Sequence, residues 1–337
     1  MISTAIVGLG WWGRHIVETL SIDNKDGNGS QFNITRAVDI DPDATREFAA
    51  ERGLDFSQDL GDSLDDDAIE AVILTTPHTF HEKQVVAAAN AGKHVFCEKP
   101  LALTRASAER AVAACDQAGV VLGLGHERRF EPAMLEIKRL VQSGELGEIM
   151  HVEANFSHDK LANLPADNWR VSKEESPAAG MTAMGIHQTD IYLTMFGPVA
   201  EIHAQTAVRN PANANGDVLT FQLRFESGAT GFFGCVMETP LYMRLCVLGS
   251  KAWVEARDYS HPSEDGPTDL FISRAEGKIE KTTYDYIDTV AANFNAWADA
   301  ITGKAPYPFT NEERIQNIAV FEAICQSVET GLPVKLK

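Results

Sequence analysis

Three glycines near the start of the chain could bind phosphate. Gly8, Gly10 and Gly13 are spaced as GxGxxG, and they follow an apolar run and open an amphipathic one. The first glycine permits a tight turn, the second lets the backbone approach a pyrophosphate, and the third lets a helix pack closely on a strand. The N–H groups at the start of that helix would face the phosphates. The spacing predicts a dinucleotide site whose loop includes Trp11 and Trp12. The alternative is a glycine-rich loop of another α/β protein.

A carboxylate at the end of the second apolar run bears on the choice of dinucleotide. Asp39 follows Gly13 by 26 residues, whereas the usual distance is about 20. An insertion at 21–33, rich in Asn, Asp and Gly, accounts for the excess. A carboxylate there holds ribose hydroxyls and repels a 2′-phosphate, so we expect NAD rather than NADP, also because Ile40 stands where an arginine would favour NADP. Alternatively, Asp39 caps the turn to Pro42, or Asp41 is the ribose ligand.

Two further residues have side chains suited to proton transfer. Lys99 follows the apolar run His94–Cys97 and precedes Pro100, and ligands of parallel sheets bind at the carboxyl ends of strands. His187 lies on an amphipathic run, and histidine titrates near neutral pH. A lysine can stabilise an alkoxide, or act as a base where burial lowers its pKa. The alternatives are a solvated surface lysine and a histidine of the core.

Other reactive side chains form weaker patterns. His78 and His81 are three residues apart, but no third ligand stands at a suitable spacing, so we expect no metal site. Cys97, inside an apolar run, is expected to be a buried thiol rather than a nucleophile. His126 and Arg129 belong to a charged cluster that either orients a substrate or forms surface ion pairs.

The first third of the chain has the pattern needed to position these residues. Short apolar runs alternate with amphipathic ones up to about residue 125, as in a doubly wound parallel sheet. The expected strands are Thr4–Val7, Ile34–Val38, Ala71–Leu74, His94–Cys97 and Val120–Leu124, and the expected helices are Gly13–Leu20, Pro42–Arg52, Phe80–Ala91 and Thr104–Ala118.

The pattern changes beyond residue 125. Short alternating strands follow one another, which predicts an antiparallel sheet. The expected strands are Ile149–Phe156, Ile202–Val208, Val218–Phe225, Gly228–Val236, Leu245–Leu248, Ala252–Ala256 and Asp269–Ile272, and the expected helices are Met134–Ser143, Thr182–Met195, Asp288–Thr302 and Glu312–Glu329. We therefore expect an α/β domain at 1–125 and an α+β domain at 126–337, whose last helix could pack back on the first domain.

Composition excludes several classes of partner. The 337 residues carry 29 Lys and Arg against 48 Asp and Glu, a net charge of −19, which disfavours nucleic acid and anionic membranes. Five widely spaced cysteines form neither a disulfide framework nor a zinc motif, and they fit a reducing compartment. No basic region precedes the first apolar run, and no run approaches the ~20 apolar residues of a membrane span. We expect a cytoplasmic protein.

Together, the motifs resemble the Gfo/Idh/MocA family of dehydrogenases, which includes glucose–fructose oxidoreductase and inositol dehydrogenase. The resemblance covers nearly the whole chain in the right order. It rests on Ala5–Gly13, Thr75-Thr76-Pro77 with His81, Ala91–Pro100, Arg129–Pro132, Gly144–Gly147, Asn168–Arg170, Gly185–His187 with Asp190, and Thr330–Pro333. It implies a Rossmann domain, then an α+β domain with an open, mostly antiparallel sheet. It also implies NAD(P)-dependent oxidation or reduction of a sugar, polyol or related cyclic alcohol.

The resemblance also implies roles for individual residues. Lys99 would hydrogen-bond the reacting oxygen and His187 would be the acid/base. His126 and Arg129 would face the substrate. The residues expected to line the cofactor are Thr75, Thr76, Pro77, His81 and Glu98, with Trp169 and Arg170 at the nicotinamide end. Members of the family associate as dimers or tetramers through the open sheet, and we expect an apolar face carrying Phe221, Leu223, Phe225, Phe232 and Cys235 to favour this.

One position departs from the family pattern. Ala183 stands where the family has an Asp, four residues before the histidine. If both lie on one helix face, His187 lacks a carboxylate partner and is the weaker base, with Asp190 as a partial substitute. Gly185 within that helix would mark a close approach of nicotinamide or substrate. Three other functions stay open: an enzyme of this fold that uses bound NAD transiently (glycosidase or oxidation–elimination type), a dihydrodiol dehydrogenase, and a non-catalytic NAD-binding regulator.

Overall fold

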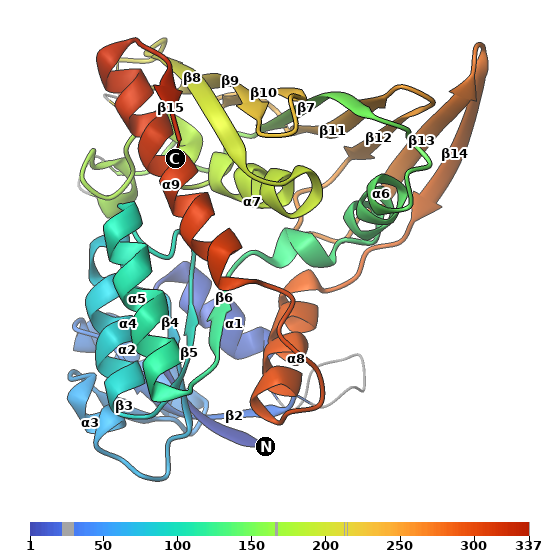
Figure 1. The fold of residues 1–337 in the computed structure, drawn as a ribbon. Helices are drawn as coiled ribbons and strands as arrows, with labels where there is room; N and C mark the ends of the chain where they lie inside the picture. Colours follow the sequence, from blue (N-terminus) through green and yellow to red (C-terminus); the bar gives the residue numbers. More distant parts are fainter. Residues whose placement is uncertain (22–29, 166–167, 212, 214, 337) are drawn as a thin grey trace. The chain divides into compact units, whose positions relative to one another are not determined.

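The computed structural model describes residues 1–21, 30–165, 168–211, 213 and 215–336. The chain divides into two compact units (Figure 1). Unit 1 comprises Met1–Glu127 and Val290–Ile315, and unit 2 comprises Arg128–Thr289 and Gln316–Lys337. Helix α8 (Thr289–Ile301), which the sequence analysis assigned to the second domain, thus belongs to unit 1 except for its first residue. Most of the expected insertion at 21–33 lies outside the described residues.

Unit 1 contains a six-stranded sheet in the order β3-β2-β1-β4-β5-β6, in which every pair of neighbours is parallel. This confirms the predicted doubly wound sheet. The strands are β1 (Ile2–Val7), β2 (Phe32–Val38), β3 (Asp55–Ser57), β4 (Ala71–Leu74), β5 (His94–Cys97) and β6 (Leu122–Leu124). The helices are α1 (Trp11–Thr19), α2 (Pro42–Glu51), α3 (Gly61–Leu64), α4 (His81–Asn90), α5 (Arg105–Ala118) and α8.

Side chains from the returning segment 290–315 cover the free edge of β6. The Asn293 amide donates to the Leu124 carbonyl (2.8 Å), and the Arg314 guanidinium donates to the Leu122 carbonyl (2.7 Å). Trp297 donates its ring N–H to the carbonyl of Val121. The bonds to Leu122 and Leu124 satisfy acceptors that a further strand would otherwise have to pair, whereas the Val121 carbonyl also accepts the Val95 N–H of β5. The segment therefore closes the sheet at the strand that leads to His126.

Unit 2 contains a nine-stranded sheet in the order β14-β13-β12-β11-β7-β10-β9-β8-β15. All neighbours are antiparallel except the pair β7 and β10, which is parallel. The predicted mostly antiparallel sheet is confirmed. Its strands are β7 (Ile149–Ser157), β8 (Val199–Ala207), β9 (Val218–Phe225), β10 (Thr230–Val236), β11 (Tyr242–Gly249), β12 (Trp253–Asp258), β13 (Thr268–Ala275), β14 (Lys278–Tyr284) and β15 (Val334–Lys335).

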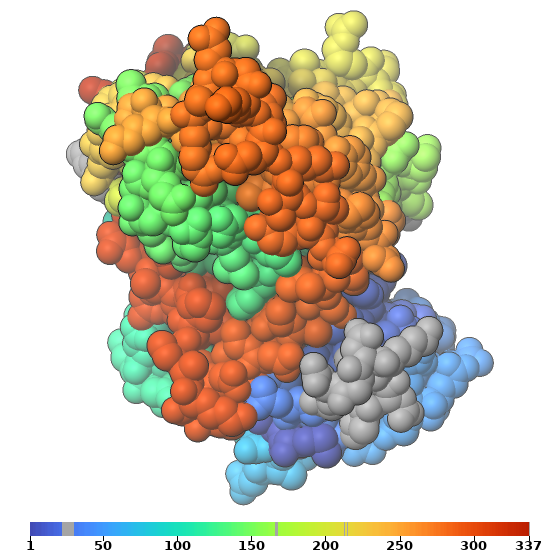
Figure 2. Space-filling model, turned by 90° about the vertical axis from the view of Figure 1, so that its right-hand side faces the viewer, coloured from blue at the N-terminus to red at the C-terminus, as the bar shows by residue number. Residues whose placement is uncertain are grey.

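Helices pack on one face of this sheet. Helix α6 (Pro132–Gln142) packs on β12 and β13, and α7 (Gly185–Phe196) packs on β10. The residues of α9 (Asn311–Thr330) that belong to unit 2 lie beside β8, where Ser327 accepts a hydrogen bond from the Ala204 N–H. The opposite face carries no helix among the described residues (Figure 1). Strand β14 has mostly exposed residues and lies on the surface of unit 2 (Figure 2).

The apolar face that was expected to favour association is the face that α7 covers, so it is not the open face of the sheet. Phe221, Leu223, Phe225 and Cys235 are buried, and Phe225 packs against Tyr192 and Phe196 of α7. Phe232 pairs with Gln222, whereas its neighbour Phe233 pairs with Phe221. Because successive side chains of a strand alternate between faces, Phe232 lies on the open face and not with the others.

No helix of the described chain is long and apolar enough to cross a membrane.

Candidate functional site

The glycine loop of unit 1 fits a pyrophosphate. Gly8 has a φ of +92°, which favours glycine. A Cβ on Gly13 would lie 2.0 Å from the Gly8 carbonyl oxygen, so only glycine lets α1 start this close to β1. A Cβ on Gly10 would meet nothing within 4 Å. Gly10 therefore stands at open space beside the start of α1, where helix N–H groups attract anions. Trp11, in the same loop, is 65% exposed, whereas Trp12 packs partly against the core.

Asp39 is hydrogen-bonded to this loop. Its Oδ2 accepts from the Leu9 N–H (2.6 Å) and its Oδ1 accepts from the Asp41 N–H (2.9 Å). Asp41, in contrast, is the N-cap of α2 and accepts from the N–H groups of Asp43 and Ala44. The structure thus separates the two carboxylates: Asp39 joins the end of β2 to the glycine loop, and Asp41 starts the next helix. Ile40 between them is 85% exposed.

The ends of β4 and β5 carry the next set of predicted residues. The Thr75 hydroxyl donates to the Val7 carbonyl (3.1 Å) and also contacts the Gly8 carbonyl, so it fastens β4 to the glycine loop. Thr76, which precedes Pro77, donates its hydroxyl to Gln84 of α4 (2.5 Å). The ring of His81 is completely buried, with one nitrogen on the Thr76 carbonyl and the other on the Pro100 carbonyl.

Lys99 lies just after β5, between Glu98 and Pro100, and both of these neighbours are hydrogen-bonded. Its own N–H donates to Glu98 Oε2 (3.1 Å), and Glu98 is buried. A Cβ on Gly125 would lie 2.4 Å from Glu98 Oε2, so this glycine makes room for the carboxylate.

Burial raises the pKa of the Cys97 thiol well above its usual value, and the nearby Glu98 adds to the effect. Cys97 is therefore a protonated, unreactive thiol at neutral pH. Beyond β6, the buried His126 stacks on Phe309.

In unit 2, three histidines surround Phe156 at the end of β7. The Phe156 ring centroid lies 6.5 Å from that of His187, 5.4 Å from that of His158 and 5.9 Å from that of His261. His158 and His261 are 5.2 Å apart. Each accepts a backbone N–H at Nδ1, from Lys160 and Ser263 respectively. A neutral ring with Nδ1 as acceptor carries its proton on Nε2. The sequence analysis did not identify His158 or His261, because they lie in loops without a motif.

Helix α7 is fixed by a buried ion pair. Arg129 donates from Nε and from a terminal nitrogen to the two oxygens of Asp190, both at 2.7 Å, and both side chains are about 95% buried. The Tyr192 hydroxyl donates to the Phe232 carbonyl (2.7 Å). Both oxygens of Asp190 bind Arg129, so this carboxylate fixes α7, and its expected role beside His187 stays a prediction.

The structure also corrects the interpretation of the segment before His187. Helix α7 begins at Gly185, so Ala183 precedes the helix and the argument from a shared helix face does not apply. Gly185 is the first helical residue, and a Cβ there would lie 2.5 Å from the Met181 sulfur. The side chain of Met181 therefore packs against the place that a Cβ of residue 185 would occupy.

Trp169 and Arg170 lie on a short 3₁₀ helix of unit 2. Asn168 starts it by accepting the Arg170 N–H (3.0 Å), and the Arg170 guanidinium lies 4.1 Å from the centre of the Trp169 ring system. This stacking orders both side chains against each other.

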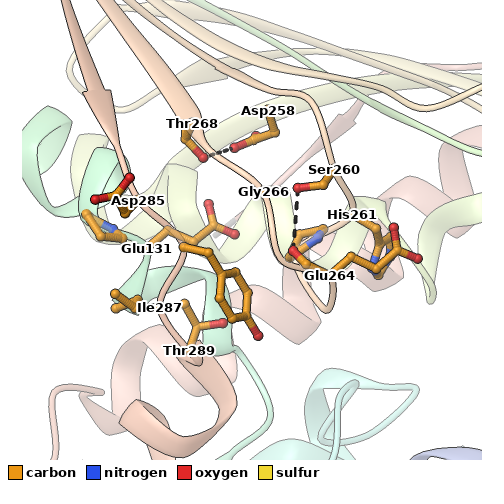
Figure 3. Close-up of a pocket in the computed structure, with 13 residues that line it drawn as sticks. Glu131, Asp258, Ser260, His261, Glu264, Gly266, Thr268, Asp285, Ile287 and Thr289 are labelled. Carbon is orange, nitrogen blue, oxygen red and sulfur yellow. Dashed lines mark hydrogen bonds between the residues drawn. The ribbon is translucent and has the colours of Figure 1, made fainter. Parts of the chain in front are cut away.

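A cavity in unit 2 lies between the loop 259–267, the start of α6 and the segment that follows β14 (Figure 3). Carboxylates of Glu131, Asp258, Glu264 and Asp285 line it, together with His261. Buried Arg128 pairs with Glu131 (2.8 Å) and lies 3.5 Å from Asp258. Burial raises the pKa of Glu131, and Arg128 opposes this effect. Within the described ranges, no three His, Cys, Asp or Glu side chains are grouped to hold a metal ion.

Comparisons with known proteins agree with this architecture. Residues 2–126 match the model of an oxidoreductase family with an NAD-binding Rossmann fold, and residues 134–255 match the GFO/IDH/MocA C-terminal domain. D-xylose 1-dehydrogenase (NADP(+)) of Haloarcula marismortui is 26% identical over 98% of this chain and 92% of its own.

Two solved structures share the fold. The aldose-aldose oxidoreductase of Caulobacter crescentus has a TM-score of 0.85, with 23% identity and 99% of each chain covered. The WlbA dehydrogenase of Bordetella pertussis, solved with NADH and UDP-GlcNAcA, has a TM-score of 0.83, with 24% identity over 100% of this chain and 99% of that one.

The fold and the glycine loop define a dinucleotide-binding oxidoreductase with a Rossmann unit and an α+β unit. The chain belongs to the Gfo/Idh/MocA family of oxidoreductases, because successive parts of it match both domains of that family in order.

Proposed function

We propose that this protein is an NAD-dependent dehydrogenase that transfers a hydride between the CH–OH group of a sugar, polyol or related cyclic alcohol and the nicotinamide. The observation that carries the proposal is Asp39, whose carboxylate is hydrogen-bonded to the loop that requires glycine at positions 8 and 13. The curated relative that acts on D-xylose supports the substrate class.

The proposed chemistry needs few protein groups. NAD, when bound, supplies the hydride acceptor. Lys99 is proposed to donate a hydrogen bond to the reacting oxygen and to stabilise its alkoxide character. His187, buried on α7, is proposed to take the hydroxyl proton. Thr75, Thr76, Pro77 and Glu98, with Trp169 and Arg170, are proposed to hold the cofactor, and His126 to contact the substrate. Arg129 acts through the ion pair that fixes α7.

The cofactor preference is a separate expectation. The protein should bind NAD at least tenfold more tightly than NADP, a difference of about 1.4 kcal/mol, because Asp39 repels a 2′-phosphate. Titration of the fluorescence of Trp11 and Trp12 measures both dissociation constants. Asp39→Ser should bring the two values together, and Asp41→Ser, which removes a nearby charge but keeps a side chain that can cap α2, is the matched control. Equal affinities in the wild-type protein would refute the role of Asp39.

A substrate panel tests the activity. Aldoses, inositols and dihydrodiols are incubated with NAD, and both NADH absorbance and product are followed. Accumulation of NADH with a sugar or polyol is the expected result, and accumulation with dihydrodiols alone would change the substrate class. Product without NADH would indicate that bound NAD is used transiently. Binding of NAD without any reaction would indicate a regulator.

We also propose that the protein forms a dimer or tetramer through the open face of the unit 2 sheet. This face carries an ion-pair network in which Arg244 pairs with Glu153 and Glu255, and Arg257 pairs with Glu255. Half-buried Phe232 and Phe271 belong to the same face. Light scattering at micromolar concentration should give at least twice the mass of one chain, and a monomer would contradict the proposal.

Five unpaired cysteines support a cytoplasmic location.

A further inference from the structure

His81 connects two loops of unit 1 through its ring. Nδ1 lies 2.7 Å from the carbonyl oxygen of Pro100, and Nε2 lies 2.9 Å from that of Thr76. The side chain has no exposed surface. Thr76 follows the end of β4, and Pro100 comes after the end of β5, one residue beyond Lys99. One imidazole therefore spans the carboxyl ends of two neighbouring strands, where ligands of parallel sheets bind.

Both partners of His81 are acceptors. A carbonyl oxygen cannot donate, so each contact is a hydrogen bond only when the ring nitrogen facing it carries a proton. The neutral ring has one N–H and bonds one carbonyl, and the imidazolium ring bonds both. The two contacts can be separated by mutation, since an asparagine amide nitrogen falls near Nδ1 of histidine and a glutamine amide nitrogen falls near Nε2.

The contact with Pro100 bears directly on Lys99. The Lys99 N–H is held by Glu98 Oε2 (3.1 Å) on one side, and the carbonyl of the following residue is held by His81 on the other. The backbone that carries the lysine is thus fixed at both ends by buried side chains. A long, flexible side chain places its ammonium group reproducibly only where its backbone is fixed, and a misplacement of about 1 Å can cost ~10²-fold in rate.

We propose that His81 is a positioning residue for Lys99 and not a group that contacts the cofactor: its bond to the Pro100 carbonyl sets where Lys99 presents its ammonium group. This inference rests on the proposed function in that Lys99 serves the reacting oxygen. The contact with Thr76 is separate: it is a hydrogen bond when Nε2 carries a proton, and it then holds the loop after β4.

Three substitutions separate the two bonds. His81→Asn keeps a donor for Pro100, His81→Gln keeps one for Thr76, and His81→Phe removes both. We expect kcat to fall about 10²-fold in the Phe and Gln variants and to be largely retained in the Asn variant. The pH profile of kcat should shift in the Phe and Gln variants only. NAD affinity, read by fluorescence, should change little in the Asn and Gln variants.

A second readout does not depend on turnover. The rate at which an amine-reactive ester modifies Lys99 is measured by mass spectrometry, with exposed Lys83 as the internal reference. This rate should change in the Phe and Gln variants and not in the Asn variant. His94→Phe is the matched control, because His94 accepts the Val121 N–H at the opposite end of β5. That variant should lose thermal stability without changing Lys99 reactivity.

Two outcomes would overturn the proposal. One is equal behaviour of the Asn and Gln variants. The other is a loss of activity that only follows thermal stability, as in His94→Phe, with Lys99 reactivity unchanged throughout. A wild-type protein that binds NAD but turns over no substrate would refute the proposed function instead, and the labelling comparison would still decide the role of His81.

Discussion

Replacing Lys99 by alanine is expected to lower kcat by two orders of magnitude or more. A positioned acid/base or oxyanion-stabilising group contributes typically ~10²–10⁴-fold, and Lys99 is the lysine that follows β5 at the ligand-binding edge of the unit 1 sheet. Steady-state kinetics with the best substrate of the panel measure the effect. The affinity for NAD should change much less, because the glycine loop and Asp39 stay intact.

Two comparisons make this prediction specific. Lys83→Ala, on the exposed side of α4, should leave kcat unchanged. His187→Ala is expected to cost less than Lys99→Ala, because Lys99 is proposed to stabilise the reacting oxygen itself. If His187→Ala abolishes turnover while Lys99→Ala is nearly normal, the two roles are exchanged. If both are nearly normal, these residues do not form the active site.

The largest expected effect on stability comes from the Arg129–Asp190 pair. Arg129→Met removes one partner of a bidentate ion pair that is about 95% buried. Leaving a buried charge uncompensated typically costs about 3–5 kcal/mol, so the free energy of unfolding of unit 2 should fall by that amount. Denaturant unfolding, followed by a probe in unit 2, measures the change.

An exposed ion pair provides the control for this prediction. Arg105 and Glu109 are four residues apart on α5, and their side chains are about half exposed. Arg105→Met should change the free energy of unfolding by less than about 1 kcal/mol. The double variant Arg129→Met/Asp190→Leu should recover much of the lost stability, because no buried charge is left without its partner. A loss below about 1 kcal/mol in Arg129→Met would contradict the account.

Elements of unit 1 could be predicted where an apolar run is a strand buried on both faces, as in β4 and β5. The bounds of β4 and β5 agree with the expectation residue for residue. Strand β3 gave no such signal, since it has three residues and begins with exposed Asp55. Strand β14 was missed because nearly all its residues are exposed on an edge strand. The return of α8 to unit 1 could not be predicted, because its apolar face fits either core.

The site could be predicted in part. The glycine loop, Asp39 and Lys99 have local signals, and the structure places each at a strand end of one sheet. The use of Asp190 by Arg129 could not be found from sequence, since 61 residues separate them. The start of α7 was misplaced because residues 182–184 continue its apolar pattern, whereas the backbone becomes helical only at Gly185. The family pattern includes His81, but only the structure shows its two carbonyl partners.

Isotope transfer tests the central claim most directly. The best substrate of the panel, deuterated at the carbon that bears the reacting hydroxyl, is incubated with NAD, and the nucleotide is recovered for mass spectrometry. The account predicts one deuterium in each NADH formed with the wild-type protein, and a rate lower by two orders of magnitude or more with Lys99→Ala. Conversion of the substrate with no deuterium in the recovered nucleotide would contradict it.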